Sequence, residues 1–184
     1  MSVELLGGRI LAPFFGSSIH VWGSIITVFM LSLSVGYLYG GKLSMKNPGL
    51  GRFGWFFLIA AVALLPVNFL GDHLMNSIFL YFDDPRYGSL LASAALFFIP
   101  TVILGMIAPY SVRLLVRQSE HSGRVAGSLY FVSTLGSAIG TLATSFYLVL
   151  FFEIREIIIS LVVLLVTSGT LCIIYDKYYL RRYS

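Results

Sequence analysis

Charged residues are scarce in this chain of 184 residues: only 11% are Asp, Glu, Lys or Arg, whereas 58% are hydrophobic. A soluble domain of this length needs far more charge to cover its surface, so the composition excludes an ordinary soluble protein. The mean hydropathy of +0.90 is typical of an integral membrane protein. The net charge of +4 then indicates basic cytoplasmic loops, and it gives no reason to expect nucleic acid as a partner.

Cysteine is almost absent, and the histidines are few and scattered. The single cysteine, Cys172, excludes an intrachain disulfide and a cysteine-based metal site. His20, His73 and His121 lie in separate regions without the spacing of metal ligands. No nucleophile elbow and no glycine-rich phosphate loop is present. We therefore expect no catalytic residues, no metal, no cofactor and no enzyme activity.

Long apolar runs are what the chain has in abundance. A membrane-spanning helix needs about 20 apolar residues, and lipid provides no hydrogen-bond partners for open strand edges. The sequence therefore predicts an all-α integral membrane fold, a single polytopic domain over residues 1–184. We expect a short half-helix at residues 3–15 and five full spans at residues 19–41, 53–71, 88–111, 127–152 and 157–175.

Basic residues alternate between the loops. The four connections and the tail after the last span carry three, one, three, one and three Lys or Arg residues. By the positive-inside rule the first and third connections and the C-terminus are cytoplasmic, as in a bacterial inner-membrane protein. The basic residues of these two cytoplasmic connections are Lys42, Lys46, Arg52, Arg113, Arg117 and Arg124.

The outer connection at residues 72–87 is long and amphipathic. Leu74, Ile78 and Phe82 recur at helical spacing, which predicts a short helix lying along the outer membrane interface. Such a helix is an anchor or a lid over a ligand, and the sequence leaves both open.

Small residues recur at helical intervals in two spans. In lipid such residues let helix backbones approach, so we expect packing faces, with the sliding surface of a transporter as the alternative. These residues are Ser32, Gly36 and Gly40 in the first span and Ser133, Gly136, Ser137, Gly140 and Thr141 in the fourth.

Three prolines lie inside the predicted spans. Each removes a backbone donor and is expected to bend or break its helix. Breaks of this kind mark some substrate paths, but they also occur in membrane helices that have no substrate. These prolines are Pro66, Pro100 and Pro109.

The polar residues of the membrane portion gather near the N-terminus. Glu4 and Arg9 lie in the expected half-helix, and His20 and Trp22 lie at the outer end of the first span. Glu4 and Arg9 are five residues apart, so they do not face each other well on one helix and each needs another partner. We expect these four residues to form a binding site. In the alternative, Arg9 extends to the outer headgroups and Glu4 is neutral or hydrated.

Two segments carry a resemblance to a known family. Residues 4–43, ELLGGRILAPFFGSSIHVWGSIITVFMLSLSVGYLYGGKL, and residues 109–141, PYSVRLLVRQSEHSGRVAGSLYFVSTLGSAIGT, resemble the membrane part of bacterial fused major-facilitator-like spermidine synthases. The resemblance covers nearly the whole chain. It implies a half-major-facilitator-like bundle. In that family the ELLGGR motif closes a full first helix, so here we expect a first helix that lacks its cytoplasmic half.

The resemblance implies a function only in part. The family carries a soluble aminopropyltransferase-like domain after its membrane part, and this sequence contains neither its cofactor loop nor its acidic catalytic segment. We therefore expect a transporter-like module for polyamines or other small solutes in the bilayer. The alternative is a non-catalytic anchor or assembly subunit, present as a homo-oligomer or as part of a larger membrane complex. A membrane enzyme acting on lipid or polyamine is the remaining reading.

Overall fold

The computed structural model describes residues 1–46, 48–82, 84–116 and 122–183, and for residues 122 and 179–183 it describes the backbone alone. Every regular element in these ranges is a helix, as the composition predicts. Arg117 lies outside the described residues. The elements are α1 (Ser2–Phe15), α2 (Ile19–Ser44), α3 (Leu50–Tyr81), α4 (Pro85–Leu115), α5 (Ser122–Ala143), the π-helical turn η2 (Thr144–Leu148), α6 (Val149–Phe151) and α7 (Ile154–Tyr183).

Five helical segments are long and apolar enough to cross a membrane, which supports a multi-pass membrane protein. They are Ile19–Ser44, Leu50–Tyr81, Pro85–Leu115, Gly123–Phe151 and Ile154–Tyr178. All five overlap the predicted spans, and three of them extend beyond the predicted bounds at both ends. Hydropathy marks only the apolar part of a helix, whereas backbone hydrogen bonding continues into the polar flanks. α1 is not among the five, because its 14 residues reach only about 21 Å.

Residues 72–87 do not form the separate short helix that the sequence predicts, and the predicted position along the outer membrane interface stays a prediction. Residues 72–81 are the last part of α3, which runs without a break from Leu50 to Tyr81. No glycine or proline lies between Gly71 and the end of α3, so nothing in the sequence stops the helix there. α4 then begins at Pro85, where the Asp84 carboxylate accepts a hydrogen bond from the Arg86 N–H at 2.9 Å.

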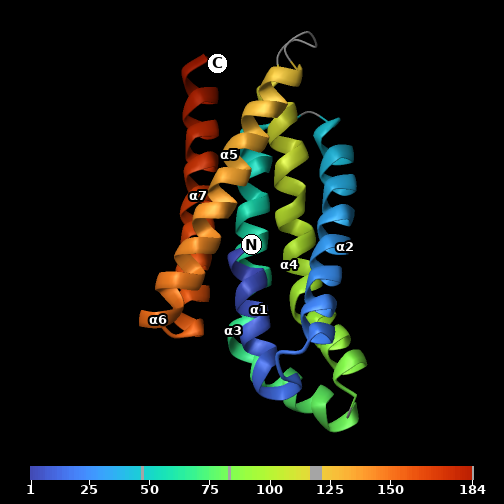
Figure 1. Cartoon of the computed structure of the whole chain (residues 1–184). Coiled ribbons are helices and arrows are strands. Elements are labelled where there is room, and N and C mark those ends of the chain that lie inside the picture. The colour runs from blue at the N-terminus through green and yellow to red at the C-terminus, as the bar shows by residue number, and fades with distance from the viewer. Residues whose placement is uncertain (47, 83, 117–121, 184) are drawn as a thin grey trace.

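The four longest helices form a row in the order α2, α4, α3, α7, as their mutual contacts show. α1 contacts all four of these helices, and Figure 1 shows α5 crossing in front of the row at a slant. α1 starts near the middle of the bundle and ends close to the start of α2. The C-terminal ends of α2 and α4 lie at the opposite end, together with the C-terminal end of α7 (Figure 1).

Glycines set the closest helix contacts in the row. Gly36 and Gly40 of α2 are buried against the α4 backbone, where a Cβ on Gly40 would lie 2.5 Å from the Met106 carbonyl oxygen. Gly54 of α3 faces Gly169 of α7, and a Cβ on Gly54 would lie 2.6 Å from the Gly169 carbonyl oxygen. Small residues therefore bring the backbones together, as expected for packing in lipid. The α3–α7 glycine pair was not singled out from the sequence.

The small residues of α5 make few close contacts within the described chain, so their role in packing stays a prediction. Ser133 and Gly136 are exposed, and a Cβ on Gly136 would meet nothing within 4 Å among the described residues. Ser137, Gly140 and Thr141 are half-buried, and Gly140 is approached only by the Ser2 hydroxyl. Only 6% of the α5 span is buried. Among the described residues, neither Gly136 nor Gly140 lies against the backbone of another helix.

None of the three prolines breaks its helix. α3 continues through Pro66, and α4 continues through Pro100 and Pro109. The irregular backbone occurs instead at η2, where Thr144–Leu148 form a π-helical turn that leads into the short α6. Bending at the prolines stays a prediction.

Candidate functional site

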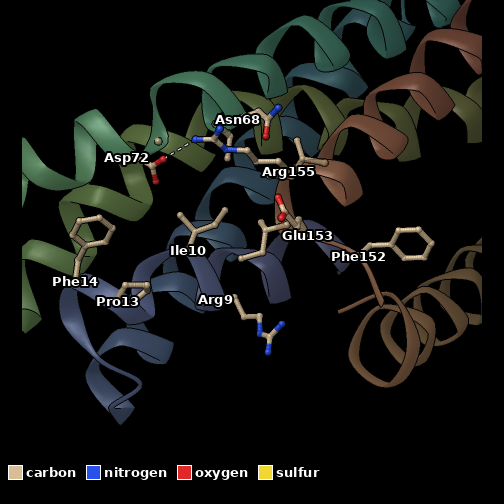
Figure 2. Close-up of a pocket in the computed structure, with 13 residues that line it drawn as sticks. Arg9, Ile10, Pro13, Phe14, Asn68, Asp72, Phe152, Glu153 and Arg155 are labelled. Carbon is tan, nitrogen blue, oxygen red and sulfur yellow. Dashed lines mark hydrogen bonds and ion pairs between the residues drawn. The ribbon is translucent and has the colours of Figure 1, made fainter. Parts of the chain in front are cut away.

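A hollow lined by several charged groups lies between α1, α3 and the start of α7. It has a volume of about 360 Å³. Four charged residues, Arg9, Asp72, Glu153 and Arg155, line it together with Asn68. α1 supplies one wall, α3 the second, and the α6–α7 connection the third (Figure 2).

The position of each wall follows from local sequence. On α3, Asn68 and Asp72 are four residues apart and therefore lie on the same face of the helix. α7 begins directly after Glu153, whose backbone N–H donates to the Glu156 carboxylate at 3.0 Å. This contact satisfies one of the free donors at the helix start and places Glu153 and Arg155 at the rim of the hollow. Gly71 lies between Asn68 and Asp72 along the chain and adds no side chain to the wall.

An ion pair joins two walls. Arg155 Nη2 lies 2.9 Å from Asp72 Oδ2, and the two side chains are 64% and 69% exposed. Exposed pairs of this kind contribute about 1 kcal/mol or less to stability, because water screens both charges. Figure 2 shows this pair next to Asn68, whereas the Arg9 guanidinium lies farther from the pair and points away from it. The pair therefore presents both charges at the rim while adding little to the fold.

Asn68 is the unusual polar residue of the site. The residue is only 8% exposed, and its Oδ1 atom has no hydrogen-bond partner among the described residues. Ser93 and Thr101 of α4 also have unpartnered buried hydroxyls, but Asn68 is the one of the three that lines this hollow. A buried carbonyl oxygen without a donor costs about 1–3 kcal/mol, so the atom is ready for a donor from outside the chain. Figure 2 shows the oxygen on the side of Asn68 that faces Arg155.

Arg9 has a second contact outside the hollow. Its Nη1 donates to the Val149 carbonyl oxygen of α6 at 3.3 Å. Val149 lies in the last turn of this helical segment, where carbonyl groups lack partners within the helix and a positive charge is favourable. Arg9 has five N–H donors, and the described residues occupy one of them, so others remain for a ligand.

The four predicted binding residues do not come together in one site. Glu4 is half-buried on the α1 face that also carries Gly8 and Leu11, and it has no hydrogen bond or ion pair among the described residues. The Trp22 ring packs on Gly8, where a Cβ would lie 2.6 Å from it. Arg9 alone belongs to the hollow described above.

His20 lies in another place. It is exposed at the start of α2 and lines a separate hollow of about 380 Å³ between α2 and α4, which also contains Arg86 and Ser24. The two hollows share no lining residue. Among the described residues, no group of three His, Cys, Asp or Glu side chains is placed to hold a metal.

Sequence reasoning did not identify four of the polar residues that line the hollow: Asn68, Asp72, Glu153 and Arg155. One signal was available for the first two, because an Asn inside an apolar run, one helical turn before an Asp, places two polar groups on one face. Arg155 and Glu153 had no such signal, because only the packing of α7 on α3 brings them to Asp72.

No protein-family model, no curated protein and no solved structure matches this chain. The resemblance to fused major-facilitator-like spermidine synthases therefore stays a prediction, and the functional argument depends on the geometry of the hollow.

Proposed function

We propose that this chain is a multi-pass membrane module that binds a small polar solute in the hollow between α1, α3 and α7 and takes part in its transport. One observation carries the proposal: the buried, unpartnered Asn68 Oδ1 lines a hollow that also holds the Asp72–Arg155 pair. Intramembrane and rim polar groups of this kind mark solute sites in helical transporters. We further propose an orientation with the C-terminus in the cytoplasm of a bacterial cell, which places this hollow at the outer face.

Gly71 provides a test that leaves every polar group in place. A Cβ at Gly71 would meet nothing within 4 Å, so Gly71→Ala fits, whereas Gly71→Leu directs a larger side chain into space next to the hollow. Purified protein in liposomes is assayed for uptake of a panel of amino acids, amines and organic acids. We expect at least one solute to accumulate above empty liposomes, with uptake retained in Gly71→Ala and reduced at least tenfold in Gly71→Leu. Absence of uptake for the whole panel, or equal uptake by both variants, would contradict the proposal.

A second candidate function is that of a non-catalytic assembly subunit. The exposed small residues of α5 favour it, because a transmembrane helix of another chain can approach such a face closely. Gly136→Leu should leave the fold intact, since nothing lies within 4 Å of a Cβ there, yet should displace a helix packed on α5. The mass of the complex extracted from native membranes in mild detergent tests this. A single-chain mass for the unaltered protein would rule this candidate out.

A further inference from the structure

We infer that the hollow between α1, α3 and α7 takes a zwitterionic solute, one that carries an ammonium group and a carboxylate or phosphate group a few ångströms apart. The inference rests on the proposed function and specifies its ligand class. It is carried by three features of the hollow: an acceptor without a donor, charges of both signs, and a limited volume.

The first feature sets the cationic end of the solute. Asn68 Oδ1 accepts hydrogen bonds only, and it has no donor in the part of the chain that the structure describes. The carboxylates of Asp72 and Glu153 line the same hollow. Glu153 donates its backbone N–H to Glu156, and its own carboxylate has no hydrogen bond or ion pair among the described residues. An ammonium group has three N–H donors and a positive charge, so it satisfies the amide oxygen and the carboxylates together.

The second feature sets the anionic end. Arg155 reaches Asp72 through one nitrogen, Nη2, and Arg9 reaches Val149 through one nitrogen, Nη1. A guanidinium has five donors in a planar fork, so both arginines retain donors for a carboxylate or phosphate. With two basic and two acidic side chains, the hollow has no excess charge of either sign. A solute with one charge of each sign therefore matches the hollow better than a solute with either charge alone.

The third feature limits size. The volume of about 360 Å³ is at the small end of the range of ligand pockets in proteins, which is about 300–1,000 Å³. A solute of the size of an amino acid fits this space. A polyamine, which carries ammonium groups alone, would bring positive charge next to Arg9 and Arg155 without an anionic group of its own for them. The structure thus favours a zwitterion over the polyamine that the family resemblance implies.

Two sources could supply this chemistry, a free solute or the headgroup of phosphatidylethanolamine, which carries an ammonium and a phosphate. The hollow lies at the level where α7 begins, so both sources could reach it if that end of the bundle is at the membrane surface. The membrane composition used in the experiment separates them.

The experiment compares three probes that share a four-carbon skeleton: γ-aminobutyrate, 1,4-diaminobutane and succinate. Binding to the full chain in phosphatidylcholine nanodiscs is measured by calorimetry. We expect γ-aminobutyrate to bind at least tenfold more tightly than either of the other two. Equal affinities, or a preference for the diamine, would overturn the zwitterion assignment. The proposed function is tested separately, by the transport assay with the wider panel of solutes.

Variants assign each end of the probe. Asn68→Leu keeps a similar side-chain size and removes the amide, so we expect at least tenfold weaker binding of γ-aminobutyrate together with unchanged or higher thermal stability, because a buried unpartnered oxygen is lost. A merely structural role of Asn68 would lower stability instead. The control, His20→Ala, alters the separate hollow and should leave the affinity unchanged. Similar affinities for Asn68→Leu and His20→Ala would overturn the assignment.

The lipid arm repeats the titration in nanodiscs that contain phosphatidylethanolamine. If the headgroup is the natural occupant, the apparent affinity for γ-aminobutyrate falls several-fold by competition. An unchanged affinity assigns the hollow to a free solute. Either result supports the zwitterion chemistry, and absence of γ-aminobutyrate binding in both membranes contradicts it.

Discussion

Arg9 is a basic residue in the mostly apolar helix α1. Its hydrogen bond to α6 gives a physical reason for a base at this position. The last turn of a helix leaves carbonyl oxygens without partners, and in low dielectric each one is costly. Arg9 donates to one of them, the Val149 oxygen of α6, from a different helix. The residue therefore has two roles, as a cap of α6 and as part of the wall of the hollow.

Replacing Arg9 tests the capping role. We expect Arg9→Leu to lower the free energy of unfolding by about 1 kcal/mol, because the Val149 oxygen loses a charged donor. Arg9→Lys should lose less, since an ammonium keeps the charge near the helix end. Thermal denaturation in detergent measures both. The control is Arg113→Leu, an exposed base with no hydrogen bond or ion pair among the described residues. Equal melting temperatures for Arg9→Leu and Arg113→Leu would favour the alternative in which Arg9 only reaches lipid headgroups.

At the scale of elements, glycine position decides how close two helices come. Gly36 of α2 lies against the Val102 carbonyl oxygen and the Gly105 backbone of α4, whereas Gly41 on the same helix has nothing within 4 Å. A methyl group at Gly36 would meet backbone, which cannot rotate away as a flexible side chain would. The two glycines therefore form a matched pair on one element.

We expect Gly36→Ala to destabilise the protein by about 1–3 kcal/mol, since α2 must move away from α4. Gly41→Ala should be neutral or stabilising by up to about 1 kcal/mol, because alanine has the higher helix propensity. Thermal denaturation of the two variants in one detergent gives the comparison. Comparable melting temperatures would show that the close α2–α4 approach does not contribute to stability.

The helices were largely predictable from the sequence, but their partners were not. Each apolar run forms a helix because the lipid core provides no hydrogen-bond partners for the backbone. In a helix the N–H and C=O groups bond to each other within the segment. The stripes of small residues on α2 and α5 look alike in sequence, yet Gly36 packs on α4 and Gly136 packs on nothing within the described chain. A stripe specifies a face able to pack and does not specify its partner. Asn68 and Arg155 could not be placed in one site from the sequence, because only the packing of α7 on α3 in the tertiary structure brings them together.

On the scale of the whole molecule, the distribution of charge and the arrangement of helices agree. The C-terminal ends of α2 and α4, which carry Lys42 and Arg113, and the C-terminal end of α7 lie at one end of the bundle (Figure 1). The hollow lies near the opposite end, where α7 starts. If the positive-inside rule holds for this chain, the hollow opens on the outer side, where a solute arriving from outside the cell would reach it.

Cysteine labelling in intact cells tests this orientation. In a Cys172→Ala background, Tyr81→Cys places a thiol at the far end of α3, and Met45→Cys places one at the basic end beside α2; the native side chains are 85% and 73% exposed. A maleimide that does not cross membranes should label the Tyr81→Cys protein in intact cells and the Met45→Cys protein only after the cells are opened. The reverse pattern would place the hollow on the cytoplasmic side. The orientation would then be wrong, and the bound solute would be taken from the cytoplasm.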